Sequence, residues 1–483
     1  MMTKYNFLCA DIGTTSLKAA LVSDKGQVLS FSKIEFSSTD RSKIALEWFT
    51  ALKESINAIK SELKKTENIS CSSNLFDSQT GTLNIDAICI SGNGPTIVSE
   101  DGTTLLWNQE VPSQKEASTS KDFSKPAEPS KPTGPSTDED LFNLIPESLK
   151  EKFSHSLFLP RLLAFKNLYN KQFTEQKIFS GPEYLIWRLS DTQITILPES
   201  RYESAYWNDQ VLDAIFGNTK NISSQKSNEG TKADSSPENA ESTRINSFPS
   251  IGPFVNPGYD SGKITGTIAQ ELGISSNAKV IAGGPDFTVA LIGTNTLSEG
   301  KLCNRAGSSE GLNWCTSKPV FASGIRTLPS VIPGLWNASV LSNNSGDKIA
   351  DCKKTYEKEN NIQISYNDYI QLCLEKKDKK GEQVLKELSD FFKDGISKIR
   401  TLSKENNIAL CDTVMVTGGQ AKNPLWLTHK AESAEINLAI CEVPDSELIG
   451  DAVLASYGLG LYDSIQAAAE KMVKIKNVFN YKK

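Results

Sequence analysis

The sequence contains little histidine, and it lacks the patterns that usually mark a nucleophile or a zinc site. Its 483 residues include only two histidines, His155 and His429, and neither lies in a nucleophile motif with serine or cysteine. Catalytic triads are therefore not expected. The nine cysteines are scattered singly, with no C-x-x-C pair and no zinc-ligand spacing. We interpret them as reduced residues, several of them packed in strands, and expect a cytoplasmic protein.

Long apolar runs and a strong net charge are also missing. No stretch approaches the roughly 18 apolar residues of a membrane span, and the first apolar run meets Asp11 too early for a signal peptide. The formal net charge is only −6. Neither nucleic acid nor a membrane is therefore expected as a partner, and an anionic ligand would need a local site to hold it.

What is present is the alternation of apolar strands, hydroxyl-rich turns and helices that is typical of an α/β protein. Residues 5–10, 17–22 and 27–36 are predicted to form an antiparallel meander of three strands. A helix with regular apolar spacing is expected over 45–65. Residues 85–102 then read as a buried strand, a glycine turn and a returning strand.

The length of the chain exceeds what one hydrophobic core usually supports, so two domains are expected, over 1–256 and 257–483. Two stretches inside the first domain, 112–140 and 218–247, are rich in Ser, Lys, Pro and acidic residues. Because they carry few large apolar side chains, we predict that both are disordered insertions.

Three turns of small and hydroxyl-bearing residues each follow an apolar strand, at 11–16, 306–309 and 418–420. Each would expose backbone N–H groups beside hydroxyls, which suits an anion, although each can also be explained as a simple chain reversal. The sequence has no G-x-x-x-x-G-K-[ST] loop, and no G-x-G-x-x-G follows a strand. A phosphate site would therefore be assembled from separate turns.

Two aspartates lie where such a site would need carboxylates. Asp11 ends the first strand beside the first turn, and it could hold Mg²⁺ or simply cap the turn. Asp286 lies between a glycine-ended strand and the start of a helix, so it could act as a general base or as a helix cap. Lys18 could meet phosphate, but we interpret it as a solvated strand residue.

These motifs resemble the FGGY carbohydrate kinases of the actin/Hsp70/sugar-kinase superfamily. Six segments carry the resemblance in the family's order: ADIGTTSLKAALVSDKGQVL (10–29), IDAICISGNGPTIVSEDGTTLLW (85–107), GKITGTIAQELGISSNAKVIAGGPDFTVALIG (262–293), GKLCNRAGSSEGLNWC (300–315), VMVTGGQAKNPLW (414–426) and ELIGDAVLASYGLGLY (447–462).

The resemblance implies an α/β fold of two actin-like (ribonuclease H-like) domains with a nucleotide- and sugar-binding cleft between them. It also implies transfer of the γ-phosphoryl group of ATP to a hydroxyl of a small sugar or polyol, with a ketopentose such as xylulose as the expected acceptor.

The same resemblance assigns roles to individual residues. Asp11 would organise Mg²⁺, and Asp286 would deprotonate the sugar hydroxyl. The ATP phosphates would be lined by Gly13, Thr14, Thr15, Gly307, Ser308 and Ser309, and the rest of the nucleotide by Gly418, Gly419, Gln420 and Asn423. The substrate would contact Asn93, Gly94, Pro95, Asp286 and Phe287.

The chain departs from the family pattern at several points. The turn at Asn93–Pro95 lacks the Gln-Met-His of xylulokinases and the Arg-Glu pair of glycerol kinases, and LWNQE is not followed by the usual Trp-x-Asp-x-Arg run. Residues 347–411 contain no Gly-Glu-Arg-x-Pro segment, so the C-terminal domain is expected to be shortened. The alternative function is a catalytically impaired, kinase-like regulatory protein that binds ATP or sugar. A homodimer is compatible with the sequence, which does not identify the sugar.

Overall fold

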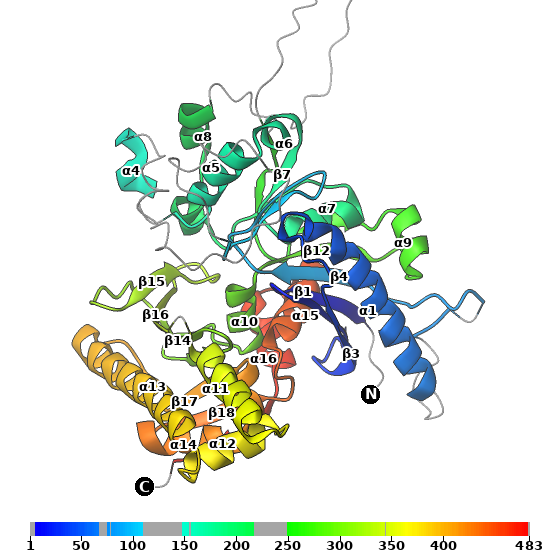
Figure 1. The fold of residues 1–483 in the computed structure, drawn as a ribbon. Coiled ribbons are helices and arrows are strands. Elements are labelled where there is room, and N and C mark those ends of the chain that lie inside the picture. Colours follow the sequence, from blue (N-terminus) through cyan, green and yellow to red (C-terminus); the bar gives the residue numbers. More distant parts are fainter. Residues whose placement is uncertain are drawn as a thin grey trace, which may run out of the picture.

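Two large β-sheets form the frame of the molecule, one in its N-terminal half and one in its C-terminal half (Figure 1). The computed structural model describes residues 5–66, 75–77, 79–109, 147–153, 156–216, 249–342 and 344–481. The predicted insertions at 112–140 and 218–247 lie outside the described residues. None of the described helices is long and apolar enough to cross a membrane.

The first sheet has six strands, with bounds β1 (Asn6–Ile12), β2 (Ser16–Ser23), β3 (Val28–Glu35), β4 (Ala87–Gly92), β11 (Asp260–Lys263) and β12 (Lys279–Pro285). Their order is β3-β2-β1-β4-β12-β11. Strands β1, β2 and β3 form the predicted antiparallel meander, while β4 runs parallel to β1 and β12 runs parallel to β4.

Strand β1 is buried on both faces because helices cover both sides of this sheet. One side carries α1 (Ala45–Thr66), which the sequence predicts, with α7 (Glu183–Ser190) and α9 (Gly266–Leu272); the other carries α10 (Asp286–Gly293), α15 (Ser446–Gly458) and α16 (Ile465–Met472). Side chains alternate along a strand, so Leu8, Ala10 and Ile12 pack toward α1, while Phe7 and Cys9 pack toward α15.

The second sheet repeats the plan of the first. Its strands are β13 (Leu302–Ala306), β14 (Glu310–Thr316), β15 (Arg326–Pro329), β16 (Trp336–Ser342), β17 (Thr413–Thr417), β18 (Asn437–Cys441) and β19 (Ile475–Phe479). Strands β16, β14 and β13 form an antiparallel meander, followed by the parallel strands β17 and β18. This order matches β3-β2-β1-β4-β12 and is the duplication that the ribonuclease H-like prediction requires.

Four helices accompany the second sheet: α11 (Ser345–Asn360), α12 (Tyr366–Leu374), α13 (Lys379–Asn406) and α14 (Pro424–Ala434). Helices α13 and α14 share a core with β13, β14 and β17, and α11 and α12 form a second core with α13. The segment 347–411, from which the predicted shortening was inferred, thus forms most of this helical layer.

Smaller elements extend the N-terminal half. They are β5 (Ile97–Ser99), β6 (Thr104–Leu105), β7 (Lys177–Phe179), β8 (Thr195–Ile196), β9 (Ser250–Ile251), β10 (Phe254–Val255), α4 (Glu147–Phe153), α5 (Leu159–Leu168), α6 (Asn170–Glu175) and α8 (Asp209–Phe216), with short 3₁₀ helices at Arg41–Lys43 and Ser200–Ala205. A further 3₁₀ helix, Gly419–Lys422, follows β17 in the C-terminal half. Strand β5, which follows the predicted glycine turn after β4, pairs with β6 and β7 in a separate sheet.

The boundary expected between residues 256 and 257 does not separate the two sheets. Strands β11 and β12 follow that boundary in the chain, yet β12 is hydrogen-bonded to β4 inside the first sheet. We therefore propose that the first domain continues to Pro285 and that the second sheet begins at Leu302. Helix α15 crosses back after β18 and packs on the first sheet.

Candidate active site

Asp11 lies near the end of β1, where burial and neighbouring acids act on its carboxyl group. Burial, and after it the charge of Glu447, raise the pKa of Asp11 from 3.8 to about 7, against the opposing effect of Lys18. Its Oδ1 atom is buried and has no hydrogen-bond partner among the described residues. A buried oxygen of this kind, in acidic surroundings, suits a cation.

Lys18 is opposite Asp11 in the β1–β2 register, and it is not the solvated strand residue that we expected. Its Nζ lies 3.8 Å from Asp11 Oδ2 and 3.0 Å from Asp445 Oδ1. Asp445 also receives Lys422 Nζ at 3.5 Å. This carboxylate therefore connects β2, which follows the first hydroxyl-rich turn, with the 3₁₀ helix that contains most of the third.

The first turn is tied to the predicted substrate turn. Gly13 N–H donates to Ser16 O at 2.9 Å, and Thr15 is exposed. The Thr14 hydroxyl accepts from Asn93 Nδ2 at 3.3 Å and from the indole N–H of Trp107 at 3.2 Å. Phosphate-binding and substrate-binding candidates are thus adjacent, with a partly exposed tryptophan beside them.

The other substrate candidates line the same region. Asn93 is buried and its Oδ1 accepts from Thr96 Oγ1 at 3.2 Å. Gly94 and Pro95 are half-buried, and a methyl group at Gly94 would lie 3.1 Å from the ring of Phe158. Phe287 is half-buried against the aromatic core of the N-terminal extension, to which Phe158 belongs.

Asp286 is the first residue of α10, and an arginine that sequence analysis overlooked engages it. Arg305, in β13, donates from Nη2 to Asp286 Oδ2 at 2.7 Å and to Glu447 Oε1 at 3.4 Å. The position before the helix belongs to Pro285, and no side chain caps it. The helix-cap explanation of Asp286 is therefore not supported by its contacts.

The second and third turns pack directly against each other. Gly418 has φ +87° and ψ −167°, a conformation restricted almost entirely to glycine, and a methyl group there would lie 2.6 Å from Ala306 O. Gly346 N–H donates to Ser308 O at 3.0 Å. Gly346 itself has no room for a side chain, because a methyl group there would lie 2.2 Å from Gly307 O. Ser308, Ser309 and Gly419 are exposed, as ligand-facing residues should be.

Asn423 and Gln420, both predicted to meet the nucleotide, have different surroundings. Asn423 Oδ1 accepts the Trp426 N–H at 2.9 Å, whereas its Nδ2 is buried without a partner in the described part of the chain. The Gln420 amide is already engaged: Nε2 donates to Glu310 Oε2 at 3.3 Å and to Ser345 Oγ at 3.0 Å.

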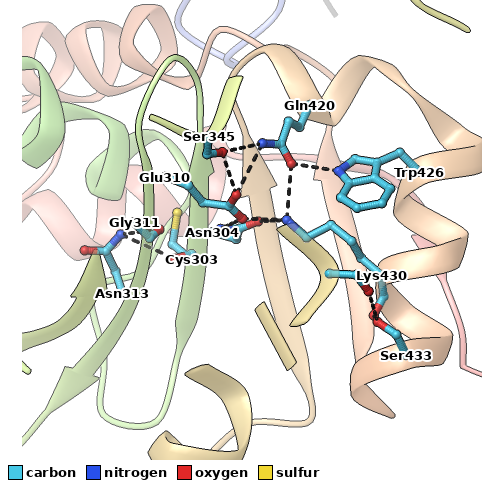
Figure 2. A network of polar contacts seen from close by, with 11 residues as sticks. Cys303, Asn304, Glu310, Gly311, Asn313, Ser345, Gln420, Trp426, Lys430 and Ser433 are labelled. Atoms are coloured by element: carbon cyan, nitrogen blue, oxygen red, sulfur yellow. Dashed lines mark hydrogen bonds and ion pairs between the residues drawn. The ribbon is translucent and has the colours of Figure 1, made fainter. Parts of the chain in front are cut away.

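Figure 2 shows the polar network that Gln420 joins. The network includes Glu310, the residue that follows the second turn, 306–309. Lys430 Nζ donates to Glu310 Oε1 at 2.6 Å, to Asn304 Oδ1 at 2.8 Å and to Gln420 Oε1 at 3.3 Å. The Trp426 indole N–H donates to the same Gln420 oxygen at 2.7 Å. Gln420 thus supports the site through its side chain, and only its backbone remains for a ligand.

The structure therefore brings residues from three separate turns and both sheets to one place. Sequence reasoning missed Arg305, Glu447, Lys430 and Glu310; the available signal was a charged residue inside an otherwise apolar strand or helix. Within the described ranges, no three His, Cys, Asp or Glu side chains form a ready-made metal cage. A metal ion here would depend on ligands from a substrate.

Comparison with known proteins agrees with this geometry. No protein-family model matches the chain. Two xylulose kinases of Staphylococcus epidermidis strains are 23% and 22% identical to it over 283 residues, which are 50% of this chain and 56% of each relative. The chain thus matches little more than half the length of these curated relatives.

Solved structures match over almost the whole chain. Three of them each align with 99% of this chain, and 94% of each of those chains is covered. They are gluconate kinase from Lactobacillus acidophilus (14% identity, TM-score 0.62), glycerol kinase from Plasmodium falciparum with ADP (13%, 0.63) and xylulose kinase from Rhodospirillum rubrum (12%, 0.63). These matches show the fold: an α/β architecture with the two actin-like domains of sugar kinases, as predicted.

Proposed function

We propose that this chain transfers the γ-phosphoryl group of ATP to a hydroxyl of a small sugar or polyol. Its fold and its relatives confirm the predicted resemblance to the FGGY carbohydrate kinases. The observation that carries the proposal is the meeting of three phosphate-type turns around Asp11 and Asp286. The relatives named xylulose kinase support a ketopentose such as xylulose as the acceptor.

Binding of ATP is assigned to residues that present backbone or hydroxyl donors. The phosphates would lie between Gly13–Thr15 and Gly307–Ser309, because N–H groups in such turns suit anions. Asn423 Nδ2, which has no partner among the described residues, and the turn at Gly418 and Gly419 would hold the remainder of the nucleotide. Lys18 adds a positive charge beside the first turn.

Asp11 fits a role in holding Mg²⁺. Its buried Oδ1 has no hydrogen-bond donor within the described chain, and Glu447 adds negative charge nearby. Proteins usually bind Mg²⁺ through one or two carboxylates, water and substrate phosphates, which agrees with the lack of a complete cage among the described side chains. When bound, the ion would neutralise charge on the phosphates.

Asp286 is proposed as the general base. Arg305 occupies Oδ2, so Oδ1 is the atom expected to take the proton of the sugar hydroxyl as its oxygen attacks phosphorus. Asn93, Trp107 and Phe287 would position the sugar, because Trp107 and Asn93 already contact Thr14 at the first turn.

The test is a substrate panel with Mg-ATP, comprising ketopentoses, polyols and aldonates, with ADP release and phosphorylated product both measured. We expect turnover with at least one acceptor, and Asp286→Asn should abolish it while retaining ATP binding. Asp412→Asn, at an exposed aspartate before β17, is the matched control. ATP binding and sugar-dependent stabilisation without any product would favour the regulatory alternative instead.

A further inference from the structure

We propose that Arg305 is a further catalytic residue, which holds the base in the free protein and stabilises the phosphoryl group during its transfer. The proposal rests on the proposed kinase function and deepens it. Arg305 lies in β13, one residue before the turn 306–309 that is expected to hold phosphate. Its guanidinium reaches across to Asp286, which starts α10 after the first sheet.

The surroundings of Arg305 argue against a purely structural ion pair. The Arg305 and Asp286 side chains are 31% and 27% exposed, so water reaches part of the pair, and such access reduces what an ion pair contributes to stability. Both neighbours of Arg305 in β13, Asn304 and Ala306, are fully buried, whereas Arg305 itself is partly exposed. A partly exposed arginine between a candidate base and a phosphate turn is better explained by a ligand.

The guanidinium also has donors to spare. Its contacts with the two carboxylates use Nη2 and Nε. In the part of the chain that the structure describes, Nη1 makes no hydrogen bond, although arginine carries five N–H donors in a fixed fork. Glu447, which is buried, holds the guanidinium at the site, so these donors remain available for a ligand.

In the proposed step the sugar hydroxyl oxygen forms a bond to the γ-phosphorus, and the bond between that phosphorus and the β–γ bridging oxygen breaks. The electron pair of the broken bond leaves with ADP, and the hydroxyl proton passes to Asp286. Arg305 donates hydrogen bonds to the γ-phosphoryl oxygens, whose charge must be stabilised while the group is in transit. Products are the sugar phosphate, ADP and the protonated carboxyl of Asp286, which then releases its proton to solvent.

The first test uses the full chain and the acceptor found in the panel. Arg305→Ala should lower kcat by roughly 10²–10³-fold, the usual cost of losing one transition-state donor, and change the KM for ATP less than threefold. Added guanidinium ion should raise the kcat of the Arg305→Ala protein at least tenfold. Arg400→Ala, remote on α13, should lose little activity and should not respond to guanidinium.

Arg305→Lys covers the case in which the alanine variant does not fold. It keeps the charge but loses the fork geometry, so we expect its kcat to fall at least tenfold with unchanged thermal stability. A kcat within threefold of wild type for either variant would overturn the proposal. A rate loss that guanidinium does not rescue in a folded Arg305→Ala protein would also overturn it.

A binding measurement separates this proposal from the kinase assignment. Fluoroaluminate added with Mg-ADP mimics the phosphoryl group in transfer, and it should tighten ADP binding to the wild type at least tenfold more than to Arg305→Ala. Equal effects on the two proteins would reject the role of Arg305. Absence of any phosphorylated product across the panel, with the fluoroaluminate difference intact, would count against the proposed sugar kinase activity and not against Arg305.

Discussion

Lys430 and Glu310 form an ion pair whose two side chains are completely buried, with Nζ 2.6 Å from Oε1. Although burial alone would raise it, the Lys430 ammonium holds the pKa of Glu310 below its ordinary value. The pair joins α14 to the strand that follows the second hydroxyl-rich turn, 306–309 (Figure 2). The geometry of that turn therefore depends on charge compensation in the interior.

Removing one member of this pair should destabilise the protein strongly. Lys430→Met leaves the Glu310 carboxylate buried without its partner, and we expect a loss of about 3–5 kcal/mol in the free energy of unfolding. Urea denaturation followed by tryptophan fluorescence measures this loss. The double variant Lys430→Met/Glu310→Gln should recover part of it.

An exposed pair provides the control. Lys348 and Glu387 lie 3.2 Å apart with side chains about half exposed, so Lys348→Met should cost less than about 1 kcal/mol. Similar losses for the buried and exposed pairs would contradict the importance of burial here.

Asp11→Asn should change how the stability of the ligand-free protein depends on pH. The pKa of Asp11 in the folded protein, about 7, lies above its ordinary value of 3.8, so folding favours the protonated carboxyl. The stability that this group contributes is complete below about pH 4 and is lost as the pH rises to about 7. We therefore expect Asp11→Asn to melt several degrees above the wild type at pH 8, and the difference to disappear near pH 4.

Thermal unfolding scans in EDTA, without nucleotide, measure this difference. If Asp11 holds Mg²⁺, adding Mg-ATP should stabilise the wild type at pH 8 much more than the asparagine variant. Parallel melting curves at every pH would show that the buried carboxyl is not the cause. Asp412→Asn should follow the wild type throughout.

Gly418→Ala should weaken nucleotide binding by disturbing two turns together. The backbone conformation of Gly418 costs other residues roughly 1–3 kcal/mol, and the added methyl would lie 2.6 Å from Ala306 O. We expect at least a tenfold rise in the Kd of an ATP analogue, measured by calorimetry. Gly266→Ala, where a methyl meets no atom within 4 Å, should leave that Kd unchanged. Equal Kd values for the two variants would count against the assigned nucleotide turn.

The first sheet's meander and the two candidate aspartates could be predicted because local sequence patterns mark them. Alternating apolar residues identified the first meander, and the position of Asp11 and Asp286 after apolar strands marked them as candidates. Lys18 was misread because its partners are set by cross-strand register and by Asp445, which is distant in the sequence.

Other parts of the site needed the three-dimensional structure. Arg305 meets Glu447 from the other end of the C-terminal half, and no local pattern encodes that contact. The boundary expected between residues 256 and 257 does not separate the sheets for the same reason: β12, which follows it in the chain, pairs with β4 from far earlier in the sequence.

The return of α15 to the first sheet has a consequence for synthesis on the ribosome. Phe7 and Cys9 come long before Leu448 and Ala452 in the chain, yet all four pack in one core, with Leu448 and Ala452 covering the face of β1 that Phe7 and Cys9 occupy. Until α15 emerges, the nascent N-terminal half exposes an apolar sheet face. The core on this side of β1 is therefore completed only once α15 has been synthesised.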